Sequence, residues 1–73
     1  SKSYQMLIKH ENSEITILSE DANRLVYKIY ILSSDKKRYS YIWQIEKVEI
    51  EGDLKGCWMT TSVSPPDFLG EVI

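Results

Sequence analysis

Four stretches of the chain are dense in β-branched and aromatic residues, and short polar segments separate them. Residues of the first kind favour strands, whereas Asp, Asn, Ser and Gly favour turns. The pattern predicts strands at about the following positions: 14–20, 24–33, 38–50 and 57–64. Because strands that follow one another in sequence usually pair, we expect a bent four-stranded antiparallel meander sheet.

The two ends of the chain carry different signals. Three apolar residues near the start have the i, i+3, i+4 spacing of one helix face: Tyr4, Leu7 and Ile8. Ser3 can cap this turn, so we predict a short helix at about 3–10. A proline pair begins the segment 65–73 and ends the predicted sheet, because proline has no amide hydrogen to donate to a strand ladder. The residues that follow the prolines form an apolar tail. The expected fold of residues 1–73 is therefore one α+β domain.

Both alternating faces of the two central stretches carry large apolar side chains. In the second stretch, one side holds Leu25, Tyr27, Ile29 and Ile31, and the other holds Val26, Tyr30 and Leu32. In the third, Tyr39, Tyr41, Trp43 and Ile45 share a side. A sheet with one face in water shows a clean alternation of apolar and polar residues. We therefore expect both faces to be covered, with a second subunit supplying part of the cover in a homo-oligomer, most simply a dimer.

Composition narrows the possible chemistry. The chain has 73 residues, with 9 basic against 11 acidic side chains, and no apolar run long enough to cross a membrane. Cys57 is the single cysteine and His10 the single histidine, so neither an internal disulfide nor an ordinary zinc site can form within one chain. The cysteine usage favours a reducing compartment, and we expect a cytoplasmic protein without cofactors.

No catalytic residue is predicted. A nucleophilic thiol needs a base, and His10 lies in a different element from Cys57, so the cysteine is interpreted as a small buried apolar side chain. An acidic cluster ends the third stretch and enters its loop: Glu46, Glu49, Glu51 and Asp53. Lysines interleave with it, which favours a solvated edge that discourages aggregation over a cation site. The sequence therefore predicts a non-enzymatic protein.

Two groups of residues are candidates for binding. The candidates for a subunit interface or a pocket are Tyr27, Tyr41, Trp43 and Trp58, because tyrosine and tryptophan bury large areas while tolerating water at one end. The alternative is a small-ligand site on the concave sheet face, with polar groups such as Tyr39 or Gln44. Basic residues beside aromatic ones can also contact anions, and the candidates are Lys36, Lys37 and Arg38. Because the overall charge is acidic, binding of single-stranded nucleic acid is the least favoured hypothesis.

The segment from Tyr39 to Ile45, followed by Gly56 to Val63, resembles the last two strands of an uncharacterised cyanobacterial and plastid family. That family belongs to the nuclear-transport-factor-like, or cystatin-like, superfamily of cone-shaped α+β folds. The likeness rests on Trp43-Gln-Ile45 and on Cys57-Trp-Met-Thr60, and covers about a third of the chain. It implies a strongly bent sheet, frequent dimerisation through that sheet, and no established activity. Enzymes of the superfamily use N-terminal helices that this chain is too short to include, and no catalytic residue carries over.

Overall fold

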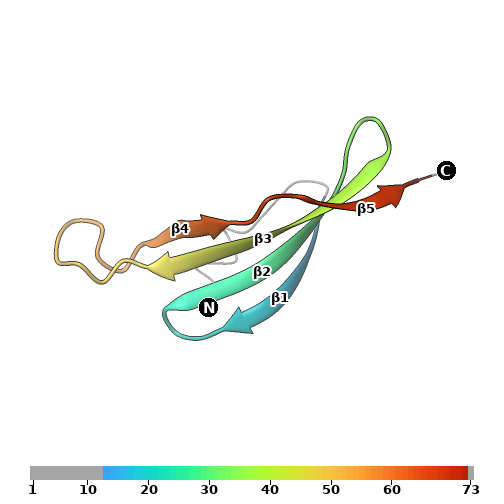
Figure 1. Ribbon diagram of the computed structural model, residues 1–73. Helices are drawn as coiled ribbons and strands as arrows, with labels where there is room; N and C mark the ends of the chain where they lie inside the picture. The colour runs from blue at the N-terminus through green and yellow to red at the C-terminus, as the bar shows by residue number, and fades with distance from the viewer. Residues whose placement is uncertain (1–12, 73) are drawn as a thin grey trace.

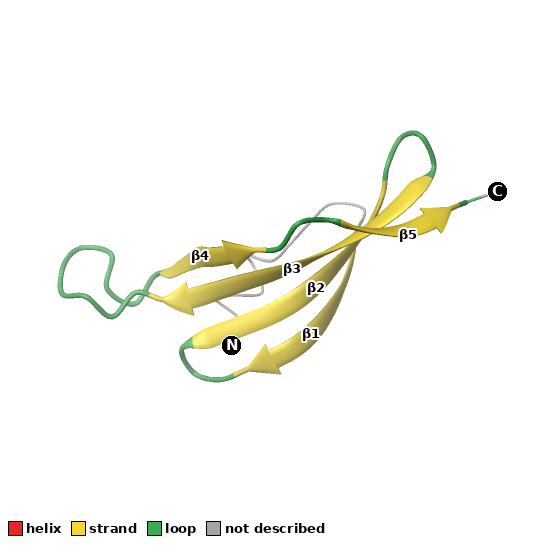
Figure 2. Cartoon of the chain, viewed as in Figure 1, coloured by secondary structure: helices red, strands yellow, loops and turns green. Residues whose placement is uncertain are grey.

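The computed structural model describes residues 13–72, and all regular structure in this range is β-strand (Figure 1, Figure 2). The strands are β1 (Glu14–Glu20), β2 (Arg24–Leu32), β3 (Lys37–Lys47), β4 (Trp58–Val63) and β5 (Asp67–Glu71). The expected α+β class is wrong for this part of the chain, because residues 13–72 contain no helix and form one antiparallel sheet. The helix expected at 3–10 lies outside the described residues.

Strand β3 is the centre of the sheet, as Figure 1 shows. One of its edges pairs with β2 along the whole length, and β1 pairs with the far side of β2. Its other edge is shared: β4 pairs with the C-terminal half and β5 with the N-terminal half. The sheet therefore has five strands rather than the expected four, and the expected tail at 65–73 contains β5.

The proline pair explains why two short strands replace one long one. Pro65 and Pro66 have no amide hydrogen to give to β3, so the ladder stops before them. Just ahead of them, the amide of Ser64 donates to the carbonyl of Ile42 (2.8 Å), and the amide of Ile42 donates to the Ser64 hydroxyl (2.7 Å). These bonds keep the chain beside β3, and pairing resumes at Asp67.

The β2–β3 turn sets the register of the central hairpin. The amide of Lys36 donates to the carbonyl of Ser33 (3.0 Å), and the amide of Ser33 donates to the carbonyl of Lys37 (2.9 Å). Lys36 has φ of 62°, the left-handed conformation that follows a type I turn in three-residue hairpin loops. Leu32 then faces Arg38, and the pairing runs without a shift to Arg24 and Glu46.

The regular register gathers the apolar side chains on one side of the sheet. We call this side the aromatic face, and define it by four residues of β2 and four of β3: Leu25, Tyr27, Ile29, Ile31, Tyr39, Tyr41, Trp43 and Ile45. The grouping of apolar residues on one side, predicted for the two central strands, is thus confirmed. The buried core lies on it and consists of Leu25, Tyr27, Ile29 and Ile45. The other side, called the opposite face, is mixed and holds Val26, Lys28, Tyr30, Leu32, Arg38, Ser40, Ile42, Gln44 and Glu46.

The molecule is elongated and one sheet thick in its described part. Its Cα radius of gyration is 14.2 Å and its extents are 50 × 21 × 20 Å. A compact domain of this length would have a radius of gyration of about 11 Å. Among residues 13–72, no helix has the length and apolar character that crossing a membrane requires. A single layer leaves much of its apolar surface uncovered by its own strands.

Candidate interaction surface

The four aromatic candidates lie on the same face of the sheet. The register places Tyr27 of β2 opposite Trp43 of β3, and their rings stack with centroids 6.4 Å apart at 25°. Tyr41 follows on the same face, opposite Ile29. Trp58 of β4 pairs with Lys47, packs against the core, and has the Lys47 ammonium 5.5 Å from its ring centre. The sequence therefore identified residues that the fold does bring together.

The aromatic face has a buried part, which belongs to the core, and an open part, whose side chains are partly or largely exposed. Tyr27 is 1% exposed, so it belongs to the interior of this chain and is not available to a partner. Tyr41, Trp43 and Trp58 are half-buried. Toward β5 the face opens: Phe68 is 57% exposed, although its ring meets that of Tyr39 at a centroid distance of 5.7 Å. The open part therefore leaves apolar side chains exposed at the surface of this chain.

A shallow hollow of about 270 Å³ lies in the open part of the aromatic face. Its lining residues come from β2, β3 and the end of β4, and we call it the Trp43 hollow: Ile29, Ile31, Tyr41, Trp43 and Val63. None of these side chains is charged, and Val63 at its rim is 48% exposed. The hollow therefore suits an apolar group.

The polar groups expected to orient a small ligand do not converge. Tyr39 lies on the aromatic face, whereas Gln44 lies on the opposite face. The Gln44 amide donates to the Glu46 carboxylate (2.6 Å) and to the Thr61 hydroxyl (3.0 Å), and Thr61 donates to Glu46 (3.0 Å). This triangle sits where the β3–β4 register shifts. It ties the two strands together at the irregularity.

The titration of two groups is displaced, in directions that give no acid–base pair. Burial raises the pKa of the Tyr27 phenol above its ordinary value of 10.0. At the hairpin tip, a hydrogen bond from the Ser33 hydroxyl lowers the pKa of the exposed Asp35 carboxyl, and the Lys37 ammonium adds to this effect. Tyr27 thus stays protonated and Asp35 ionised at neutral pH, and neither is poised to exchange a proton there.

The three basic candidates do not form one patch. Lys36 lies in the turn, and its carbonyl accepts a hydrogen bond from the Val72 amide (2.8 Å). Lys37 is 3.5 Å from the carboxylate of Asp35. Successive residues of a strand point to opposite faces, so Lys37 and Arg38 are directed away from each other. The arrangement does not favour a nucleic-acid track.

The acidic cluster and the cysteine show no built site in the described residues. Lys55 binds Glu51 in the β3–β4 loop, which leaves that carboxylate compensated. Within residues 13–72, no three His, Cys, Asp or Glu side chains are placed to hold a metal ion. Cys57 is exposed, contrary to its interpretation as a buried apolar side chain.

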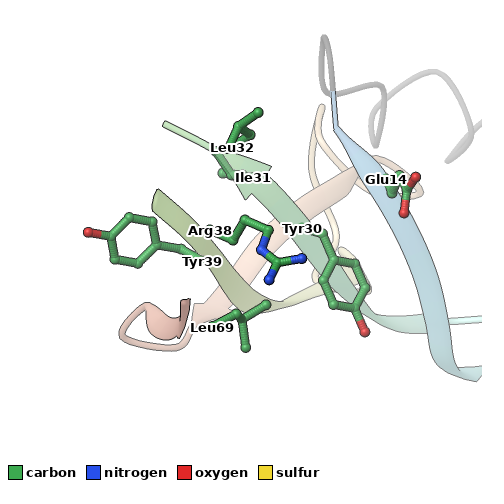
Figure 3. A pocket seen from close by; sticks show the side chains of 7 residues that line it. All are labelled: Glu14, Tyr30, Ile31, Leu32, Arg38, Tyr39 and Leu69. Carbon is green, nitrogen blue, oxygen red and sulfur yellow. The ribbon is translucent and has the colours of Figure 1, made fainter. Parts of the chain in front are cut away.

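A second hollow, of about 460 Å³, lies at the hairpin end of the sheet (Figure 3). We call it the Arg38 hollow, and its lining is Glu14, Tyr30, Ile31, Leu32, Arg38, Tyr39 and Leu69. In Figure 3 the guanidinium of Arg38 points toward the ring of Tyr30, with Leu69 beside it. Leu69 is not among the predicted site residues, because the segment after the prolines carries no alternation that predicts a strand.

No protein-family model, curated protein or solved structure matches the chain. The resemblance to the nuclear-transport-factor-like superfamily therefore stays a prediction.

Proposed function

We propose that this chain is a non-enzymatic assembly module that forms a homo-oligomer, most simply a dimer, through the open part of its aromatic face. The observation that supports the proposal is an exposed apolar surface on a one-layer sheet. Phe68, Val63 and Ile17 are exposed there, beside the half-buried Tyr41 and Trp43. Large apolar patches on otherwise charged proteins mark interaction sites.

The chemistry of the surface favours a second copy of the chain over an unlike partner. Interfaces between identical subunits are more apolar than those of transient complexes, whose composition resembles ordinary surface. Along β2 and β3, all eight residues that define the aromatic face are aliphatic or aromatic. Two such faces packed together would give two sheets with a shared core, the usual solution for a sheet that is apolar on one side. A twofold arrangement would bring the same patch from each copy.

The second candidate function is binding of a small apolar ligand in the Trp43 hollow. The observation in its favour is the uncharged lining. Its volume of about 270 Å³ is below the range of about 300–1,000 Å³ typical of ligand pockets. The hollow is thus better matched to a side chain from a partner, which is why assembly is the leading proposal.

The proposal includes no catalytic step. Cys57 is the only thiol and has no histidine in residues 13–72 to act as its base. An exposed single thiol suits a reducing environment, and we propose the cytoplasm as the location.

Molar mass in solution tests the proposal. Sedimentation equilibrium at low micromolar concentration should show a dimer that Val63→Asp converts to a monomer, because the substitution places a charge in the interface. The matched control is Met59→Asp, since Met59 is similarly exposed but pairs with Glu46 of the opposite face. The control should remain a dimer. A wild-type chain that is monomeric at every concentration would refute the proposal.

A further inference from the structure

The loop between β3 and β4 is ordered although it projects from the end of the sheet (Figure 1). At its base, the Val48 amide donates to the Cys57 carbonyl (2.8 Å) and the Gly56 amide donates to the Val48 carbonyl (2.8 Å). Within it, the amide of Cys57 donates to the Leu54 carbonyl (2.9 Å). The ion pair of Lys55 with Glu51 adds a side-chain link. The loop thus has a defined shape of its own.

This ordered loop displays two aliphatic side chains to solvent. Ile50 is 80% exposed and Leu54 is 67% exposed, more than any other large apolar residue of the described chain. Exposed acidic residues flank them in the sequence: Glu49, Glu51 and Asp53, of which Glu51 is paired with Lys55. An ordered loop that presents apolar groups without burying them has the character of a recognition element.

The opposite end of the molecule carries the complementary features. The Arg38 hollow has apolar walls, including Leu32 and Leu69, and the exposed guanidinium of Arg38 lies among them. Neither ion pair found in the described residues involves Arg38. Lys28, whose ammonium is 5.7 Å from the Tyr30 ring centre, adds a second cation near one wall. Glu14 at the rim is the one carboxylate of the lining.

We propose that the β3–β4 loop of one copy docks into the Arg38 hollow of a second copy. Ile50 and Leu54 enter the apolar part of the hollow, and the free carboxylates of Glu49 and Asp53 face the guanidinium of Arg38. The loop cannot reach the hollow of its own chain, because the two lie at opposite ends of a molecule whose longest extent is 50 Å. Charge and apolar character match on both sides of this contact, which is the reason for choosing a second copy as the partner.

The contact differs in kind from the aromatic-face dimer. It joins two different surfaces, so it is head-to-tail and generates rings or open chains instead of a closed pair. Two side chains and a few charges bury less than a standard interface, so we expect association only at high micromolar concentration and weakening by salt. The inference does not depend on the aromatic face, and the experiment separates the two.

A mixing experiment tests head-to-tail docking. All chains carry Val63→Asp, which removes the proposed face dimer. A loop variant adds Ile50→Ser and Leu54→Ser, and a hollow variant adds Arg38→Glu. In sedimentation velocity, the parent should form a concentration-dependent series of species, and each variant alone should be monomeric. An equal mixture of the two variants should recover association but stop at a dimer, because only one intact loop and one intact hollow meet.

Each possible result decides the matter. Leu18→Ser is the control, since Leu18 is exposed on β1 and lines neither surface; it should associate as the parent does. Amide NMR spectra establish that each variant is folded. A parent that stays monomeric at the highest concentration overturns the docking proposal, and so does a mixture of variants that stays monomeric. A parent whose dimers ignore both the loop and the hollow substitutions also overturns it. If the aromatic-face proposal fails instead, the wild-type chain associates in the same way as the Val63→Asp parent, and the loop and hollow substitutions keep their effects.

Discussion

The ionisation of the Tyr27 side chain depends strongly on its position in the sheet. Its ring is buried between neighbours of the core, Leu25 and Ile29, and stacks on Trp43 across the strand pair. A tyrosine at an edge would keep its hydroxyl in water. Here burial opposes ionisation of the phenol, and raises its pKa.

The raised pKa predicts a loss of stability in alkali. The folded chain holds the Tyr27 proton more tightly than the unfolded chain, whose pKa stays near 10. Below that pH the contribution is fully present, and it is lost as pH rises through the folded-state pKa. Tyr27→Phe keeps the ring and removes the titration, so its free energy of unfolding should fall less steeply above about pH 10. Urea unfolding at a series of pH values measures how the free energy of unfolding of the wild type and of Tyr27→Phe changes with pH. Equal slopes for the two proteins would contradict the raised pKa of Tyr27.

At the scale of elements, the β2–β3 turn carries a correctable strain. Lys36 adopts φ of 62°, a conformation that costs a residue with a Cβ about 1–2 kcal/mol. Lys36→Gly should therefore raise the free energy of unfolding by about 0.5–1 kcal/mol, part of the gain being offset by the greater freedom of glycine in the unfolded chain. Ser34→Gly is the control, because Ser34 has no positive φ, and it should give no gain. Urea unfolding of the two variants compares them, and a larger gain from Ser34→Gly would show the strain argument to be wrong.

The hairpins were predictable because their signals are local. Alternation between residues 24 and 32 marks β2 and assigns its two faces, and polar turns delimit it. The prediction extends the third strand too far, to residue 50, because Val48 and Ile50 continue its alternation. The structure ends β3 at Lys47, and places Ile50 in the loop. Apolar spacing cannot distinguish a paired residue from an exposed one when nothing pairs beyond it.

β5 could not be predicted from local pattern. Its five residues include Gly70 and follow two prolines, features that normally argue against a strand. What makes it a strand is the vacant edge of β3 beyond the end of β4. Gly70 has φ of 114° opposite Arg38, where the register shifts. The same non-local pairing brings Phe68 onto the aromatic face and Leu69 into the Arg38 hollow, so both surfaces were only partly visible in the sequence.

At the scale of the whole molecule, a one-layer sheet that self-associates should depend on its concentration for stability. Binding of a second copy stabilises the folded state by mass action, by up to about 1.4 kcal/mol for a tenfold rise in concentration. The Tm of the wild-type chain should therefore rise with concentration. Phe68→Asp should abolish that rise, because Phe68 is 57% exposed in the single chain and lies in the proposed interface, while its effect on the isolated fold stays small.

Scanning calorimetry over a hundredfold range of concentration measures the Tm. Tyr27→Asp serves as the contrasting change, since it places a charge in the core of the single chain and should unfold it at every concentration. If Phe68→Asp lowered Tm as much at low as at high concentration, Phe68 would be supporting its own chain through the Tyr39 ring. The aromatic face would then be an interior that this chain completes by itself, and the assembly proposal would fall with it.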